Sequence, residues 1–366
     1  MSAYIYDLAT AVPATFEPQK TLRDLMKSTV ANDRKTRTIV HQMYTHSGIE
    51  KRHIAHAHNF YNNEHSFFHR VLDEQNPPRT EERNTIYKKE ATILFVEVAQ
   101  QLLSQNPHID KHEITHIITV SCTGFFAPGP DFELVRHLGL SPATQRYHLG
   151  FMGCYASVPA LKMAKAFVDA DPNALVLVIS CELCTLHFQA EKTLDNLIAG
   201  SVFADGAAGA LVGSKPPATS GFEMLAFTSD LAYEGEKDMA WSIGNFGFNL
   251  RLSSYVPDII GGNIAHIMAP IFNTMRITAQ EISTWAIHPG GRAIIDKMEK
   301  SMKLTPAQVR PSRTVLANFG NMSSATILFV LAEVRRSGIA SGSNVLPIAF
   351  GPGLTIETGL LRYLES

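Results

Sequence analysis

The pattern of apolar and polar positions predicts that strands and helices alternate along the chain. Two short runs of apolar and β-branched residues, 114–120 and 174–180, each lead into a loop. The second run does not alternate, which is typical of a strand with helices on both faces. Apolar residues recur at helical spacing in 85–106, in 131–138 and from Tyr155 onwards. The order βαβαβ, followed by a similar set, predicts an α/β fold of two related halves.

The predicted halves are residues 1–215 and 216–366, and no flexible linker divides them. The stretch 76–83 is polar and contains two prolines, so we expect a loop there. Shorter patterns predict strands at 4–11, 203–212, 283–287 and from Thr314, helices from Leu22, at 256–272 and up to Arg335, and a final hairpin at 345–362.

Composition and charge exclude several classes of protein. The 366 residues carry 32 Lys and Arg against 34 Asp and Glu, without a block of like charge, so neither nucleic acid nor an anionic membrane surface is an expected partner. No apolar run is long enough to span a bilayer, and the N-terminus lacks the pattern of a signal peptide. The four cysteines do not make a disulfide framework in a chain of this length. These features predict a cytoplasmic protein with reduced thiols.

Cys154 lies between a glycine and a segment with the pattern of a helix. From Tyr155 onwards the residues at helical spacing are small or apolar. At a helix N-terminus the macrodipole and the free backbone N–H groups favour a thiolate, which is the nucleophilic form of cysteine. The alternative is that Cys154 is a small hydrophobic residue in a buried turn.

His288 and Asn321 share this local setting. Each lies in a loop with glycine nearby, next to an apolar element that can hold it rigidly, and such loops often carry catalytic groups. Cysteine and imidazole can form a thiolate–imidazolium couple, and an amide beside them can donate hydrogen bonds to a carbonyl oxygen that becomes negative. Taken singly, His288 could be a structural histidine and Asn321 could be a turn former, rather than catalytic residues. The combination favours a catalytic site.

Two further patterns leave alternatives open. Cys181 and Cys184 have the spacing of a zinc or redox motif, but no second pair of cysteines and no nearby set of Cys and His completes a metal site. We therefore expect no metal. Residues 33–58 are rich in Lys, Arg and His, which indicates either a solvated helical face or a rim that receives phosphate groups.

Four motifs together resemble the signature set of type III polyketide synthases, the chalcone synthase-like family. They are Met152-Gly-Cys154, Ile287-His288-Pro-Gly-Gly, Gly320-Asn321-Met-Ser-Ser and Phe350-Gly-Pro-Gly-Leu-Thr355. The segment 120–129 is also similar to the bacterial branch of the family. The resemblance implies a thiolase-like αβαβα layered fold with an internal duplication, a homodimer, and no cofactor beyond the coenzyme A thioesters that serve as substrates.

The same resemblance implies a role for each catalytic candidate. Cys154 would take the acyl group of a starter acyl-CoA, and His288 would keep its sulfur ionised. His288 and Asn321 would stabilise the enolate that forms when malonyl-CoA loses carbon dioxide. This carbanion would attack the acyl thioester in a decarboxylative Claisen condensation, and cyclisation would follow.

Other positions that match the family shape its substrate cavity: Phe203, Leu250, Cys122, Cys184, Ser323, Gly351 and Gly353. Phe203 matches one of two aromatic gatekeepers, whereas Leu250 stands where plant members carry phenylalanine, and the two cysteines are slim. These features predict an apolar passage for a medium or long fatty acyl-CoA starter, with alkylpyrones or alkylresorcinols as products. In plant members basic residues grip the CoA phosphates, and the corresponding segment here offers His46 and Gln42.

Three other classes of protein share some of these features. A 3-ketoacyl-carrier-protein synthase of the priming type uses Cys, His and Asn on the same fold, but its histidine and asparagine motifs differ from those found here. A papain-like cysteine hydrolase would carry a Cys-Gly-Ser-Cys-Trp pattern near the N-terminus, which this sequence lacks. A non-catalytic acyl-CoA-binding or scaffold protein would have no chemical need for Cys154, His288 and Asn321 together.

Overall fold

A computed structural model describes residues 2–56, 66–73, 75–253 and 256–365. Within them, one mixed sheet has nine strands in the order β11-β12-β13-β8-β1-β7-β6-β4-β5, and two small sheets pair β9 with β10 and β2 with β3. The strands are β1 (Ala3–Ala11), β2 (Phe16–Pro18), β3 (Lys51–His53), β4 (His116–Ser121), β5 (Gln145–Gly150), β6 (Val176–Leu183), β7 (Asp205–Gly213), β8 (Ser220–Leu231), β9 (Met239–Gly244), β10 (Gly247–Leu252), β11 (Ile282–Ile287), β12 (Asn344–Gly351) and β13 (Thr355–Glu365). The α-helices are α1 (Gln19–Thr29), α2 (Arg34–Thr45), α3 (Phe67–Val71), α4 (Thr80–Gln105), α5 (Pro130–Leu138), α6 (Ser157–Ala170), α7 (Leu194–Val202), α8 (Val256–Met275), α9 (Arg292–Met302), α10 (Pro306–Phe319) and α11 (Thr326–Arg336).

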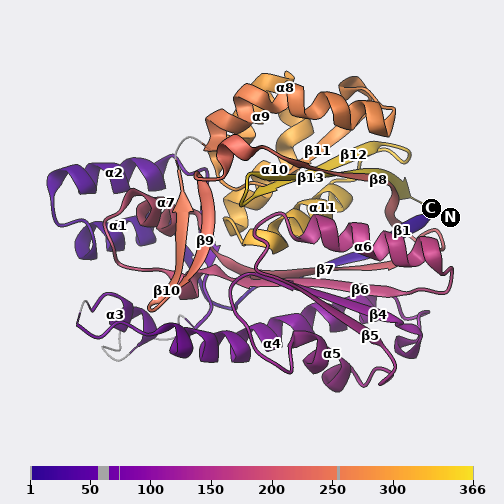
Figure 1. Cartoon of the computed structure of the whole chain (residues 1–366), viewed down its shortest axis with the longest axis horizontal. Helices are drawn as coiled ribbons and strands as arrows, with labels where there is room; N and C mark the ends of the chain where they lie inside the picture. Colours follow the sequence, from indigo (N-terminus) through magenta and orange to yellow (C-terminus); the bar gives the residue numbers. More distant parts are fainter. Residues whose placement is uncertain (1, 57–65, 74, 254–255, 366) are drawn as a thin grey trace.

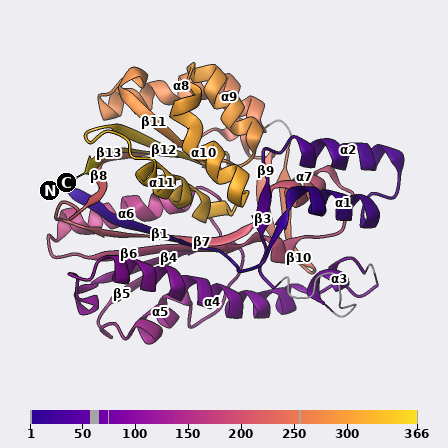
Figure 2. The same ribbon diagram turned by 180° about the vertical axis from the view of Figure 1, so that it is seen from behind.

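The large sheet forms two stacked parts with helices on both sides of each (Figure 1). α8 and α9 cover the part with β11, β12 and β13, and α4 and α5 cover the part with β7, β6 and β4 (Figure 2). α6 and α11 lie between the two parts, where residues such as Ala160, Ala164 and Ile327 belong to the central hydrophobic core. The layers are therefore helix, sheet, helix, sheet, helix.

The sheet runs through both predicted halves without a break. β1 pairs with β7 of its own half, and its first residues also pair with β8 of the other half, where Ala3 lies opposite Met224. The two halves therefore share one continuous sheet. The division into 1–215 and 216–366 stays a prediction.

Most of the predicted elements are present. Strands β1, β4, β6, β7 and β11 and the hairpin β12–β13 lie where strands were expected, and helices α5, α6, α8 and α11 lie where helices were expected. β6 is buried along its whole length, because helices cover both of its faces, as its continuous apolar run predicts.

The strand predicted from Thr314 is wrong, since residues 314–319 are the last turns of α10. This helix begins much earlier, at a capping box of Thr305 and Gln308 with Pro306 in the first helical position. Its buried residues Val309, Ser312, Val315 and Leu316 recur at helical spacing. The β-branched residues Thr314 and Val315 near its end suggest a strand and obscure this helical spacing in the sequence.

The loop predicted at 76–83 is too long, because α4 already begins at Thr80. The Glu82 carboxylate accepts a hydrogen bond from the Arg79 N–H at 3.0 Å and so caps the first turn. Glu81 and Glu82 also place negative charge near the positive end of the helix dipole.

One end of the molecule consists of α1, α2, α3, α7 and the hairpin β9–β10 (Figures 1 and 2). The hairpin was not predicted from the sequence. It pairs Leu250 with Trp241 and Leu252 with Met239 across its two strands. Directly paired residues project from the same face of a hairpin, so these four side chains form one surface.

Two features are absent from the described residues. No helix among them is long and apolar enough to cross a membrane. No group of at least three His, Cys, Asp or Glu side chains in that part of the chain is arranged to hold a metal ion.

Candidate active site

Cys154 lies in a tight turn between β5 and α6. The turn is closed by a hydrogen bond from the Ala156 N–H to the Gly153 carbonyl at 3.1 Å, and α6 starts at Ser157. Gly153 has a φ of 109°, and a Cβ on it would lie 2.4 Å from Cδ of Pro352, so only glycine fits. The sulfur is therefore held one turn before the helix rather than at its first residue.

His288 follows the last residue of β11. Its N–H donates to the Ile348 carbonyl of the neighbouring strand β12 at 2.8 Å. The imidazole is buried, and neither ring nitrogen has a hydrogen-bond partner among the described residues. An unpaired buried imidazole is costly, and both ring nitrogens remain available to a ligand.

Asn321 follows α10 after one glycine and is fixed on all sides. Its N–H donates to the Val202 carbonyl at 2.9 Å, and its carbonyl accepts from the Ala204 N–H at 2.8 Å. Its side-chain Nδ2 donates to the Gly290 carbonyl at 3.2 Å, and its Oδ1 accepts from the Ser323 N–H at 2.9 Å. The amide is thus oriented with its donor group beside the His288 loop.

These three side chains, which are distant in sequence, line one cavity, which we call the Cys154 chamber. Eight of the predicted site residues contribute to its wall: Cys154, His288, Asn321, Phe203, Leu250, Cys122, Cys184 and Ser323. The two predicted glycines do not line it. Gly351 instead lets its loop approach the nucleophile turn, since a Cβ there would lie 2.3 Å from the Tyr155 ring, and Gly353 has a φ of 130° that favours glycine.

Burial favours the neutral forms of Cys154 and His288. It raises the pKa of the Cys154 thiol to about 11 and lowers the pKa of His288 to about 3. The Ser323 hydroxyl donates to the Cys154 Sγ at 3.4 Å and acts in the opposite direction on the pKa of Cys154. The sequence predicted a thiolate from the helix N-terminus, but it does not reveal the loss of water around the sulfur, which raises the pKa of the thiol.

A buried carboxylate, which the sequence did not reveal, supports the wall behind Cys122. Glu182 accepts hydrogen bonds from the Cys122 N–H at 2.9 Å and from the Thr123 hydroxyl at 2.7 Å, and a further one from the Ser324 hydroxyl. Burial raises its pKa. The carboxylate thus ties β6 to the loop after β4 and to the segment after Asn321.

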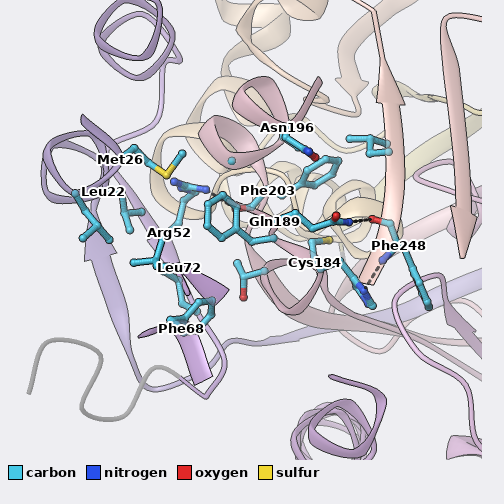
Figure 3. A pocket seen from close by; sticks show the side chains of 18 of the residues that line it. Leu22, Met26, Arg52, Phe68, Leu72, Cys184, Gln189, Asn196, Phe203 and Phe248 are labelled. Atoms are coloured by element: carbon cyan, nitrogen blue, oxygen red, sulfur yellow. Dashed lines mark hydrogen bonds between the residues drawn. The ribbon is translucent and has the colours of Figure 1, made fainter. Parts of the chain in front are cut away.

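A second chamber adjoins the first. The two share Cys184, Phe203, Trp241 and Leu250 as a common partition. The far side of the second chamber is mainly apolar and comes from α1, α2 and the α3 region: Leu22, Leu25, Met26, Tyr44, Phe68 and Leu72. Figure 3 shows Leu22, Met26, Phe68 and Leu72 on one side of this space and Cys184, Phe203 and Phe248 on the other.

Three lining residues of the hairpin, Met239, Trp241 and Leu252, were missed in the sequence. Trp241 pairs across the hairpin with the predicted residue Leu250, and Met239 pairs with Leu252, and all four line the Cys154 chamber. The alternation of these residues on either side of a Gly-rich turn was the available signal. Gln42 and His46, in the segment where plant members carry the basic residues that grip the CoA phosphates, are exposed at the end of α2.

Comparisons with known proteins agree with this geometry. Residues 2–216 match the family described as chalcone and stilbene synthases, N-terminal domain, and residues 223–365 match the C-terminal domain of the same family. Among solved structures, the C-terminal type III polyketide synthase domain of Steely1, a type I/III hybrid from Dictyostelium, is 28% identical, with a TM-score of 0.91 over 99% of both chains. PKS-I from the brown alga Ectocarpus siliculosus is 25% identical, with a TM-score of 0.88 over 99% of this chain and 98% of that one. These likenesses confirm the predicted thiolase-like fold.

Proposed function

Since the chain belongs to the chalcone and stilbene synthase family and is a type III polyketide synthase, we propose that Cys154, His288 and Asn321 carry its decarboxylative condensation. The observation that supports this assignment is their position on the wall of one cavity. The family match also favours a polyketide synthase over the priming-type ketoacyl synthase and over a scaffold protein.

In the proposed loading step, the Cys154 sulfur attacks the thioester carbonyl of an acyl-CoA. A thiol with a pKa of about 11 is mostly protonated at neutral pH, so the proton must leave as the bond forms. The neutral His288 imidazole accepts it and then returns it to the departing coenzyme A thiolate. Loading by this route needs no standing ion pair.

In the proposed extension step, malonyl-CoA loses carbon dioxide in the same chamber. The enolate oxygen that develops accepts hydrogen bonds from Asn321 Nδ2 and from a ring N–H of His288. One hydrogen of Nδ2 is bound to the Gly290 carbonyl, which orients the other. Because these donors are buried, they stabilise negative charge more than donors in water would. The carbanion then attacks the acyl group on Cys154, and the sulfur leaves as the thiolate.

We further propose that the starter is a medium or long fatty acyl-CoA and that the product is an alkylpyrone or alkylresorcinol. The second chamber supports this proposal, because it offers a mainly apolar space next to the Cys154 chamber. Leu250 belongs to the partition between the two chambers. Burying each methylene of an alkyl chain contributes about 0.8 kcal/mol, or about a fourfold gain in affinity. An aromatic starter would leave this space empty.

A panel of acyl-CoA starters with malonyl-CoA, read by mass spectrometry, tests the starter class. We expect kcat/KM to rise with chain length, by up to about fourfold per methylene, until the second chamber is full. A maximum with acetyl-CoA, malonyl-CoA or an aromatic starter would contradict the proposal. No metal or organic cofactor needs to be added in this assay, since coenzyme A thioesters are the only expected small-molecule partners.

The homodimer that the resemblance implied is also a proposal. In the described part of the sheet, β5 forms an open edge and pairs only with β4, and an open edge can pair with a strand of another chain. The exposed rings of Phe125 and Phe132 contact Phe151 and Arg146, respectively, beside this edge. Light scattering should give the mass of two chains, and a monomer would contradict the proposal.

Two further predictions concern the cellular location of the enzyme and its branch of the family. A cytoplasmic location is supported by the four cysteines, all of which are free. Membership of the bacterial branch rests only on the segment 120–129 and stays a prediction.

A further inference from the structure

The imidazole of His187 is a buried titratable group that the reaction does not use. It ends the short helix η2 (Cys184–His187), which follows β6, and it lines the second chamber. Its ring stacks on Phe248 of β10 with the centroids 3.9 Å apart and an angle of 12° between the planes. The edge of Trp241 from β9 lies against the same imidazole, at 6.1 Å and 80°.

Both ring nitrogens of His187 are bound to backbone, on opposite sides. Nδ1 faces the Phe248 N–H at 3.1 Å, and Nε2 faces the Thr123 carbonyl at 2.7 Å. A backbone N–H can only donate and a carbonyl can only accept, so Nδ1 must be the acceptor and Nε2 must carry the proton. The contacts therefore require one neutral tautomer, which agrees with the burial that lowers the pKa of His187 to about 3.

From these contacts we propose that His187 is a positioning residue that sets the place of the β9–β10 hairpin and, with it, the partition between the two chambers. Thr123 belongs to the loop that forms the wall of the Cys154 chamber, and Phe248 belongs to the hairpin that carries Leu250. His187 is the bridge between them. A shift of the hairpin would move Trp241 and Leu250 together, because they are paired across its strands.

Other hydrogen bonds also hold the hairpin, through Trp241, through Gln189 and at the turn. Trp241 Nε1 donates to the Cys122 carbonyl at 3.0 Å. This bond fixes the Trp241 side chain, which is part of the partition, rather than the backbone of the hairpin. Gln189 Nε2 donates to the Phe248 carbonyl at 3.2 Å. Thr80 holds the turn of the hairpin, since its hydroxyl accepts from the Gly247 N–H at 2.9 Å and donates to the Gly244 carbonyl, and its N–H donates to the Asn245 carbonyl at 2.9 Å. His187 differs from these because it bonds to the backbone of β10 at Phe248, the second residue of the strand, and stacks on the Phe248 ring at the same time.

Three substitutions separate the two hydrogen bonds. His187→Asn places an amide oxygen near the position of Nδ1 and can keep the bond from the Phe248 N–H. His187→Gln places an amide nitrogen near the position of Nε2 and can keep only the bond to the Thr123 carbonyl. His187→Leu keeps neither. If the bond to β10 sets the hairpin, the hairpin should stay in place in the Asn variant and move in the Gln and Leu variants.

The first readout does not depend on the starter. The chain has two tryptophans, so the full-length protein labelled with 5-fluorotryptophan gives two ¹⁹F resonances, which Trp241→Phe assigns. Trp285 is fully buried in the core under α8 and serves as the internal control. We expect the Trp241 resonance to shift and broaden in the Leu and Gln variants and to stay near its wild-type position in the Asn variant. The Trp285 resonance should stay unchanged in all three.

The second readout rests on the proposed starter class. The ratio of kcat/KM for a long-chain acyl-CoA to that for acetyl-CoA should fall about fivefold in the Gln variant, the effect of one buried hydrogen bond, while malonyl-CoA decarboxylation changes less than the ratio does. A wild-type enzyme without preference for long starters would refute the starter proposal and leave the ¹⁹F test of His187 intact. A Trp241 resonance that is unchanged in the Gln variant, or displaced equally in Asn and Gln, would overturn the role of His187. The Asn and Gln pair decides the matter even if the Leu variant does not fold.

Discussion

The two chambers differ in how their walls are built. The Cys154 chamber takes its polar groups from three short loops, and backbone hydrogen bonds or close glycine contacts fix Cys154, His288 and Asn321 in place. The second chamber takes its wall from side chains of the end helices, which pack in an apolar cluster, and from the hairpin, which hydrogen bonds through side chains such as Trp241 and Gln189 hold in place. We infer that the first chamber determines whether the reaction occurs and the second determines which starter takes part.

This difference gives each chamber its own kinetic signature. A change in the Cys154 chamber should affect every starter by a similar factor, because in the proposed reaction all starters pass through the same thioester and enolate. A change in the second chamber should affect starters in proportion to how much of their chain it holds. A variant can therefore be assigned to one chamber by comparing its change in kcat/KM for a long-chain acyl-CoA with its change for acetyl-CoA.

The largest effect should follow from removal of the nucleophile. Cys154→Ala should abolish acyl loading for long and short starters alike, since no other cysteine is combined with His288 in this way. Cys122 and Cys184 line the same chamber, and burial holds the pKa of each far above its usual range, so neither should substitute. Intact-protein mass spectrometry checks this, and an acyl adduct on the variant would refute the assignment.

The next largest effect should come from the donors to the enolate. His288→Gln and Asn321→Ala should each slow malonyl-CoA decarboxylation by about 100-fold or more, because each removes a donor to the developing charge. The factor should not depend on the starter. Release of labelled carbon dioxide measures it, and near-normal release in both variants would refute the proposed role of these donors.

The sequence predicted the first chamber better than the second, for a physical reason. Cys154, His288 and Asn321 each lie next to one element, α6, β11 and α10, and local patterns show residues of this kind even where, as in α10, the type of element is mistaken. The second chamber depends on the pairing of Trp241 with Leu250 across a hairpin and on the packing of α1 and α2 on its far side. Such contacts join distant segments, and one sequence alone does not specify them. The high pKa of Cys154 was missed for the same reason, since burial follows from the whole fold.

A variant of the partition should show an intermediate effect that depends on chain length. Leu250→Trp places a larger side chain between the chambers, so long-chain starters should lose about tenfold or more in kcat/KM, the value of about two excluded methylenes. Acetyl-CoA should be nearly unaffected. Leu252→Trp is the matched control, because Leu252 lies on the same strand face but lines only the Cys154 chamber, and it should affect all starters. An unchanged length profile in Leu250→Trp would mean that no alkyl chain passes there.

The smallest effect concerns the hydroxyl that donates to the sulfur. Ser323 holds its Oγ 3.4 Å from the Cys154 Sγ and does so with a φ of 47°, in the left-handed region that costs energy for a residue other than glycine. A donor stabilises the thiolate more than the thiol and so lowers the pKa of the sulfur. Ser323→Ala should therefore raise the pKa of Cys154 from its value of about 11.

Alkylation of Cys154 by iodoacetamide measures this change. Below the pKa the thiolate fraction, and hence the rate, should rise about tenfold per pH unit in the wild-type enzyme. Ser323→Ala should shift this dependence of the rate on pH to higher pH, so that the alkylation rate at any fixed pH falls about fivefold, the effect of one hydrogen bond.

Ser323→Gly is the matched control, because it removes the same hydroxyl and also relieves the strained backbone conformation. Equal rates in the Ala and Gly variants would assign the effect to the hydroxyl, whereas a normal rate in Gly alone would assign it to backbone strain. A wild-type rate that stays level between neutral and alkaline pH would instead mean that the thiolate is already formed, with His288 as its partner in the Cys154 chamber.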